Sequence, residues 1–173
     1  MPSAAKRMMK LKDALVGEPG LWLAVAESLT SGHVQARIAE VSGASEFFSG
    51  GITAYNIEQK VKHLGVNRAA ARKVNCVSGE IASQMAVGVC KLFGSDLGLS
   101  TTGYAEPAPD LDRTHPFAWW AIAHRGKRGK FTVRTGRIEC PGASRIQAQA
   151  MIADAALTEL MEFVSELREP VRR

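Results

Sequence analysis

The stretch from Leu21 to Glu40 constrains the fold most strongly, because its hydrophobic pattern changes within a few residues. It begins with the unbroken apolar run Leu21–Ala26, which is typical of a strand covered on both faces. Small polar residues follow, and apolar residues then recur at a helical spacing, at Val34 and Ile38. The pattern predicts a strand, a turn and a helix, with Ser28 in the turn at the carboxyl end of the strand. Ligands of open α/β sheets bind at such ends.

Two interpretations of this turn stay open. Thr30 or Ser31 can cap the predicted helix, and the free backbone N–H groups beyond them favour an anion. In the alternative, Ser28, Thr30 and Ser31 serve only as capping residues, since small polar side chains are preferred at helix starts. The residues of the turn do not by themselves distinguish a ligand site from a cap.

Length and composition indicate a single domain. The chain has 173 residues, 46% of them hydrophobic, so residues 1–173 are predicted to form one unit with a substantial core. No apolar run reaches the ~20 residues of a membrane span, and the N-terminal residues fit a first helix better than a signal peptide. Cys76, Cys90 and Cys140 form no CxxC pair, which argues against a zinc site or a disulfide framework. We therefore expect a cytoplasmic protein with no membrane contact, metal or cofactor.

The net charge of +5 raises the question of a nucleic-acid partner. The excess positive charge lies in His124–Arg137 and in the C-terminal tail. Only 6% of the residues are aromatic, and no nucleic-acid-binding motif is present. We predict that Arg125–Lys130 is a solvent-exposed hairpin turn and that the chain binds no nucleic acid specifically.

The remaining chain alternates strand-like and helix-like segments, which favours an α/β fold with a mixed sheet and helices on both faces. Asn56 is placed to cap one helix, with Gln59 three residues later as in a capping box, and Gly65 to end it. Ser78 is placed to cap another helix, whose apolar face includes Leu92. The predicted strands are Leu21–Ala26, Ile52–Tyr55, Asp96–Gly103, Phe117–His124 and Lys130–Arg137, with Cys76–Ser78 extended. The predicted helices are Lys6–Val16, Ser31–Glu40, one between Asn56 and Gly65, Asn67–Lys73, Glu80–Phe93 and Ser144–Glu166.

Three strand exits carry groups suited to acyl transfer. Ser28 follows one predicted strand, Thr102 lies at the end of a second and Tyr55 at the end of a third, and Lys60 lies one helical turn beyond Tyr55. Long helical side chains lean toward the N-terminus of their helix, so Lys60 can reach the mouth of the sheet. A serine nucleophile needs a base, and a lysine whose pKa is lowered by burial can act as one. The alternative is that Lys60 is a solvated helix residue and Tyr55 a half-buried strand residue.

Four sequence blocks resemble a known family. They read AESLTSG (Ala26–Gly32), GGITAYNIEQKVKHLGV (Gly50–Val66), VSGEIASQMAVG (Val77–Gly88) and DLGLSTTGYAEP (Asp96–Pro107), and they occur in the order seen in the CinA C-terminal domain family. That family includes the nicotinamide-nucleotide amidases. The resemblance covers about Leu21 to Pro107, continues weakly into the last helix, and implies a three-layer α/β/α fold with a mixed, mostly parallel sheet. It also implies a homo-oligomer that hydrolyses the carboxamide of nicotinamide mononucleotide, or of a related small amide, to the acid and ammonia.

The same resemblance implies roles for individual residues. It assigns the nucleophile to Ser28 and the other catalytic positions to Tyr55 and Lys60, with no metal. A small nucleotide-like substrate is expected to contact further residues at the strand exits and before the last helix, namely Glu27, Thr30, Gly32, Thr102, Gly103 and Arg145. Many family members carry this domain behind a second, molybdopterin-binding-like domain. This chain is too short for that arrangement and is expected to stand alone.

The chain departs from the family pattern where substrate recognition is expected. The usual ESCTGG block has Leu29 and Ser31 in place of its cysteine and first glycine. The family's glycine-rich loop is replaced by Ala105–Pro116, which is rich in prolines and acids. The arginine of the family's GDR motif is missing at the matched position, and Arg145 follows directly. We expect a retained reaction centre with altered recognition; the alternative is a non-catalytic relative that binds a ligand or a partner.

Overall fold

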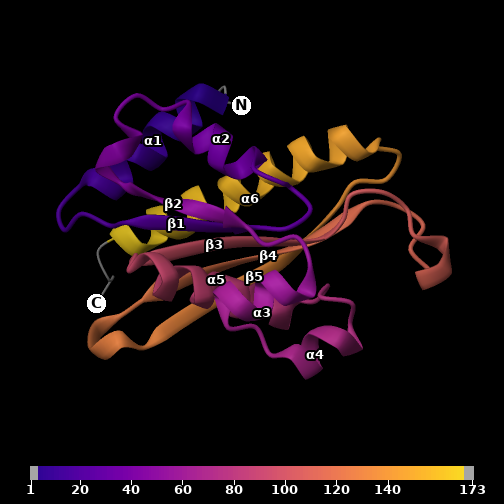
Figure 1. Cartoon of the computed structure of the whole chain (residues 1–173). Helices are drawn as coiled ribbons and strands as arrows, with labels where there is room; N and C mark the ends of the chain where they lie inside the picture. Colours follow the sequence, from indigo (N-terminus) through magenta and orange to yellow (C-terminus); the bar gives the residue numbers. More distant parts are fainter. Residues whose placement is uncertain (1–3, 170–173) are drawn as a thin grey trace.

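A five-stranded sheet lies between two layers of helices in the computed structural model, which describes residues 4–169 (Figure 1). The strands are β1 (Leu23–Glu27), β2 (Phe48–Thr53), β3 (Leu97–Tyr104), β4 (Phe117–Arg125) and β5 (Phe131–Glu139). The α-helices are α1 (Ala4–Val16), α2 (His33–Ala39), α3 (Ile57–Leu64), α4 (Arg68–Lys73), α5 (Gly79–Phe93) and α6 (Arg145–Arg168). Short 3₁₀ turns lie at η1 (Ala44–Glu46), η2 (Pro109–Leu111) and η3 (Lys127–Gly129).

The strand order is β2-β1-β3-β4-β5. Strand β1 pairs in parallel with β2 and β3, whereas β4 is antiparallel to both β3 and β5. Four strands therefore run in one direction and β4 runs in the other, which confirms the prediction of a mixed, mostly parallel sheet. The carboxyl ends of β1, β2 and β3 meet at one edge of the sheet.

Both faces of the sheet are covered, with α1, α2 and α6 on one side and α3, α4 and α5 on the other (Figure 1). Every residue of β1 is buried, as the apolar run that ends at Ala26 predicts for all but the acidic last residue, Glu27. Leu23 and Val25 pack into the cluster formed with α1 and α6, whereas Ala24 and Ala26 pack against α5. The small side chains on the second face let α5 lie close to the sheet.

Helix boundaries follow from the capping residues. The Asn56 side chain accepts a hydrogen bond from the Gln59 backbone N–H, and Gly65 ends α3 in the left-handed conformation. The Gln59 side chain bonds His63 instead of the Asn56 backbone, so only half of the predicted capping box forms. Ser144 begins α6 with a complete capping box. These local signals are why the predicted helices lie close to the observed ones.

Three local predictions were wrong. Strand β2 begins at Phe48 and ends at Thr53, so Tyr55 lies in the connection after the strand. Cys76 lies in a turn and not in an extended segment, and its φ angle of 62° is left-handed. Leu92 is 47% exposed, because its position on α5 turns away from the sheet.

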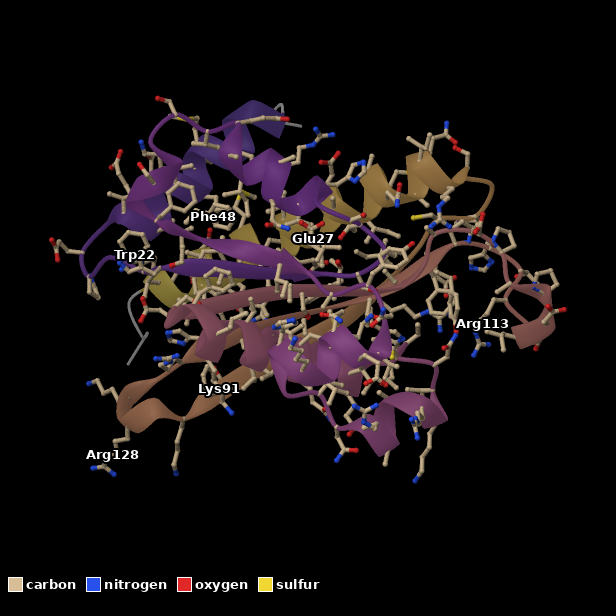
Figure 2. The ribbon with its side chains drawn as sticks, viewed as in Figure 1. Trp22, Glu27, Phe48, Lys91, Arg113 and Arg128 are labelled. Atoms are coloured by element: carbon tan, nitrogen blue, oxygen red, sulfur yellow. The ribbon has the colours of Figure 1, made fainter. Side chains whose placement is uncertain are left out.

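The turn between β4 and β5 lies at the surface of the molecule. The hairpin turn between β4 and β5 is exposed from Lys127 to Lys130, as predicted, and Arg128 extends from it (Figure 2). Arg125, which was predicted to lie in the exposed turn, is instead the half-buried last residue of β4 and donates to the Cys90 carbonyl. Among residues 4–169, no helix combines the length and the apolar character that crossing a membrane requires.

The close approach of α5 to β3 yields a first prediction. A Cβ added at Gly98 would overlap the Ala86 carbonyl oxygen of α5, so Gly98→Ala must push the helix from the sheet. We expect the free energy of unfolding to fall by about 1–3 kcal/mol, the usual cost of overpacking a core. Urea denaturation measures this change. Gly20→Ala is the control, since an added Cβ at Gly20 meets nothing within 4 Å; equal stability of the two variants would contradict the prediction.

Candidate active site

Ser28 and Lys60 meet at the carboxyl edge of the sheet. Ser28 directly follows β1, where its backbone N–H bonds the Thr101 carbonyl and its carbonyl accepts from Ser31. Lys60 belongs to α3, which follows β2, so the parallel pairing of β1 and β2 brings the two residues together. The Lys60 Nζ lies 2.9 Å from the Ser28 Oγ, and the residues are only 1% and 7% exposed, respectively.

The environment of Lys60 makes its charged form less favourable than that of a lysine in water. Burial lowers the pKa of the Lys60 amine, and the nearby Cys76 thiol has a smaller, opposing influence on that pKa. No carboxylate pairs with Lys60 in the described part of the chain. Its second hydrogen bond goes to the Tyr55 backbone carbonyl, at 3.1 Å. A neutral amine held in this way can donate to Tyr55 and turn its lone pair toward the Ser28 hydroxyl.

A cleft of about 630 Å³ opens in front of this pair. Its walls come from the turn after β1, from α3 and α4, from the end of β3 and from the start of α6. Its polar and aromatic lining residues include Ser28, Tyr55, Lys60, Arg72, Asn75, Cys76, Thr102, Tyr104, Glu106 and Arg145. The cleft lies where α/β folds bind their ligands.

Arg145 forms the outer wall of the cleft. Its Nη2 donates to the Tyr55 hydroxyl at 2.7 Å, and its Nη1 donates to Glu106 Oε1 at 2.7 Å. The Tyr55 side chain is 52% exposed. Tyr55 therefore contacts Lys60 through its backbone carbonyl, while its phenol contacts Arg145.

Thr102 and Gly103 also line the cleft. The Thr102 hydroxyl donates to the Cys76 carbonyl at 2.8 Å, which fixes the left-handed turn that presents Cys76. Gly103 packs so closely against β4 that an added Cβ would overlap the Phe117 carbonyl oxygen. Both residues therefore shape the floor of the cleft.

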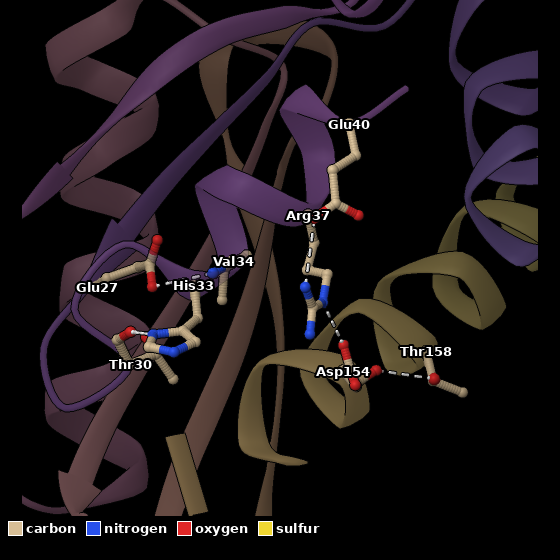
Figure 3. Close-up of polar contacts among 8 residues, drawn as sticks. All are labelled: Glu27, Thr30, His33, Val34, Arg37, Glu40, Asp154 and Thr158. Atoms are coloured by element: carbon tan, nitrogen blue, oxygen red, sulfur yellow. Dashed lines mark hydrogen bonds and ion pairs between the residues drawn. The ribbon is translucent and has the colours of Figure 1, made fainter. Parts of the chain in front are cut away.

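Glu27, Thr30 and Gly32 do not line the cleft. The fully buried Glu27 carboxylate accepts hydrogen bonds from the backbone N–H groups of Gly32, Val34 and Gln35. Figure 3 shows the bond from Val34. The Thr30 hydroxyl bonds that of Thr101 at 2.7 Å. The start of α2 thus does hold an anion, but the anion is the chain's own side chain.

Sequence reasoning did not place Arg72, Asn75, Cys76, Tyr104 or Glu106 at the site, although all of them line the cleft. Cys76, Arg72 and Glu106 all come from turns or short elements whose direction no periodicity indicates. Burial raises the pKa of the Cys76 thiol, and the charge of Lys60 opposes this shift.

Within residues 4–169, no group of three or more His, Cys, Asp or Glu side chains is arranged to hold a metal ion.

Comparison with known proteins identifies related sequences. The family model of the CinA C-terminal domain matches residues 5–164. A CinA-like protein of Chlorobium limicola is 36% identical over 160 residues, which are 91% of this chain but 37% of that protein. A CinA-like protein of Kosmotoga olearia is 46% identical over 93 residues, 54% of this chain and 23% of that protein. The chain thus spans well under half the length of these relatives.

Solved structures share the fold. The competence damage-inducible protein A from Klebsiella pneumoniae superposes with a TM-score of 0.85 at 24% identity, covering 96% of this chain and all (100%) of that one. The competence or damage-inducible protein from Enterobacter asburiae gives a TM-score of 0.82 at 22% identity, covering 95% and 99% of the two chains. At these identities the likeness concerns the arrangement of the sheet and its helices.

The position of Glu27 yields a second prediction. Glu27→Gln replaces one acceptor oxygen by an N–H₂ group that faces backbone N–H donors, so hydrogen bonds from Gly32, Val34 or Gln35 are lost. We expect a loss of about 1–3 kcal/mol in the free energy of unfolding, measured by urea denaturation. Glu40→Gln is the matched control, because Glu40 lies at the exposed C-terminal end of α2, the helix whose first turn Glu27 caps. It is expected to change the free energy of unfolding by about 0.5 kcal/mol or less. A Glu27→Gln protein as stable as the parent would contradict the assigned capping role.

Proposed function

The chain belongs to the CinA C-terminal domain family, and from this premise we propose that it is a serine amidohydrolase of small carboxamides. The observation that carries the proposal is the buried 2.9 Å contact between Lys60 Nζ and Ser28 Oγ. A lysine without a carboxylate partner, with a pKa lowered by burial, has the properties of a general base for a serine.

The reaction proceeds in two halves. Ser28 Oγ attacks the amide carbon while Lys60 accepts its proton, and Lys60 then donates that proton to the departing ammonia. A water molecule enters, Lys60 takes its proton, and the hydroxide attacks the acyl ester. Lys60 then returns the proton to the departing Ser28 Oγ, which gives the acid, free Ser28 and a neutral Lys60. The atoms balance with the amide, water and these two side chains.

A backbone group of the Ser28 turn is available to the oxyanion. Within the described residues, the N–H group of Leu29, which lines the cleft, has no hydrogen-bond partner. It directly follows the nucleophile, where N–H groups stabilise the tetrahedral intermediate in acyl transfer. Tyr55 acts as a positioning residue, because its carbonyl holds the amine of Lys60 and its phenol holds Arg145.

The substrate class follows from the cleft and from the family. We place nicotinamide mononucleotide and related small aromatic amides within this class, since Tyr55 and Tyr104 offer aromatic surfaces beside polar groups. Cytoplasmic location, a homo-oligomer and the absence of a specific nucleic-acid partner are parts of the same proposal. The second candidate is a non-catalytic ligand-binding domain, favoured by the changed loop Ala105–Pro116.

Substitution of the two central residues tests the proposal. With a panel of pyridine carboxamides, Ser28→Ala and Lys60→Met should each lower ammonia release by several orders of magnitude while ligand binding persists. The double variant should be little worse than either single one, because residues that act as a unit do not add. Lys62→Met, an exposed lysine on the same helix, is the control and should keep parental turnover. Undiminished turnover by Ser28→Ala would refute the serine mechanism, and a parent that binds but hydrolyses no amide would favour the second candidate.

The lowered pKa of Lys60 also predicts a pH dependence. Turnover should rise with pH as the amine loses its proton, and level off above its folded-state pKa. Between that pKa and the ordinary, higher value of the unfolded chain, the unfolded state binds more protons, so the free energy of unfolding should rise with pH. Urea denaturation of the parent and of Lys60→Met at several pH values measures this rise, which the variant should lack. An equal rise in both proteins would assign the effect to other groups.

A further inference from the structure

The outer end of the cleft contains an internally neutralised arginine. Both terminal nitrogens of Arg145 are occupied, one by the Glu106 carboxylate and one by the Tyr55 hydroxyl, each at 2.7 Å. Glu106 is the only acidic side chain among the described residues that line the cleft. A guanidinium normally attracts phosphate or carboxylate groups through this fork, and here the protein supplies the carboxylate.

We propose that Glu106 is a specificity-determining residue that blocks anion recognition by Arg145, so that the cleft takes carboxamides without a phosphate group. This inference rests on the proposed amidohydrolase function and narrows its substrate class. Aromatic amides without an acidic group, such as nicotinamide nucleosides or simple pyridine carboxamides, fit the site better than nucleotides do.

The geometry of the cleft places the two chemistries at its opposite ends. The Tyr55 carbonyl contacts Lys60 at the buried end, and the Tyr55 hydroxyl contacts Arg145 at the exposed end. The length of one tyrosine residue therefore separates the reacting pair from the arginine. A substrate whose amide reaches Ser28 extends toward Arg145, and any acidic group at its far end meets Glu106.

The backbone at Glu106 is held in position by its neighbours, whereas its exposed side chain is held by Arg145. Ala105 is buried in a small cluster with Leu29 and Ala118, at the point where the chain leaves β3. Pro107 follows and restricts the backbone, and a bridge between Ala108 and Arg113 closes the projecting loop. The Glu106 side chain is therefore attached to a fixed backbone position beside Arg145. A phosphate that binds Arg145 must either displace the Glu106 carboxylate or bind with that negative charge close by.

Arg72 offers the competing explanation. It lines the cleft from α4, and no ion pair involves it among residues 4–169. If a substrate phosphate binds Arg72, then Glu106 has no influence on anion selection. Substitution of Arg72 and of Arg145 distinguishes which of the two binds a substrate phosphate.

The test compares nicotinamide riboside with nicotinamide mononucleotide, two carboxamides that differ by one phosphate group. Binding is measured by calorimetry in the Ser28→Ala background, which prevents turnover. Without a further change, the riboside should bind at least as tightly as the mononucleotide. Glu106→Gln should tighten mononucleotide binding about tenfold, since like charges at a binding site oppose association, and change riboside binding by less than about twofold. Glu106→Ala should act in the same direction.

Two further variants serve as controls. Asp110→Asn makes the same charge change on the same loop, but Asp110 does not line the cleft, so it should not alter the preference. Adding Arg145→Gln to Glu106→Gln should abolish the gain. The proposal is overturned if Glu106→Gln and Asp110→Asn act alike, or if tight mononucleotide binding is already present with Glu106 and disappears with Arg72→Ala.

Inorganic phosphate provides an arm that does not depend on the proposed reaction. With otherwise intact protein, phosphate should raise the melting temperature of Glu106→Gln more than chloride of equal ionic strength, and should not do so for the parent or for Glu106→Gln/Arg145→Gln. This result in a protein that hydrolyses no amide would refute the amidase and keep the role of Glu106. Amidase activity without the phosphate effect would refute the role of Glu106 alone.

Discussion

A carboxylate without solvent contact, that of Glu27, holds the first turn of α2 against the end of β1. A buried charge is costly unless it is fully paired, and here three backbone N–H groups and the Gln35 amide satisfy it. The helix dipole adds a favourable interaction at the same place. The turn between strand and helix thereby acquires one conformation, and Ser28 lies within it. Arg37 then ties α2 to Asp154 of α6, at 3.0 Å (Figure 3).

The second constraint is the burial of Lys60. An amine removed from water without a carboxylate partner destabilises its charged form, and the fold accepts this cost at one position. The surrounding structure offers two hydrogen-bond partners, Ser28 and the Tyr55 carbonyl, which suit a neutral amine. Groups with such perturbed pKa values cluster at functional sites, because catalysis requires a base that is unprotonated near neutral pH. The stability lost at Lys60 is thus the counterpart of its proposed chemistry.

Local patterns explain which features could be predicted from the sequence. The buried strand β1 and the caps at Asn56 and Ser144 depend on neighbouring residues, so hydrophobic pattern and capping chemistry predicted them. The meeting of Ser28 with Lys60 depends on parallel pairing between β1 and β2, which residue spacing alone does not specify. Sequence blocks resembling a known family supplied that step.

The direction of side chains in connections was beyond such reasoning. Tyr55 was predicted on a strand, but it follows β2 and turns its phenol toward Arg145, which lies 90 residues away in the chain. The Glu106–Arg145 pair likewise joins the loop after β3 to the first residue of α6. Exposed pairs of this kind contribute about 1 kcal/mol or less to stability, so the fold tolerates changes there. The Ser28–Lys60 pair is held by the pairing of β1 and β2 in the sheet, whereas the Glu106–Arg145 side chains are held by little more than their own charges. Recognition can therefore change at the rim while the arrangement of Ser28 and Lys60 remains intact.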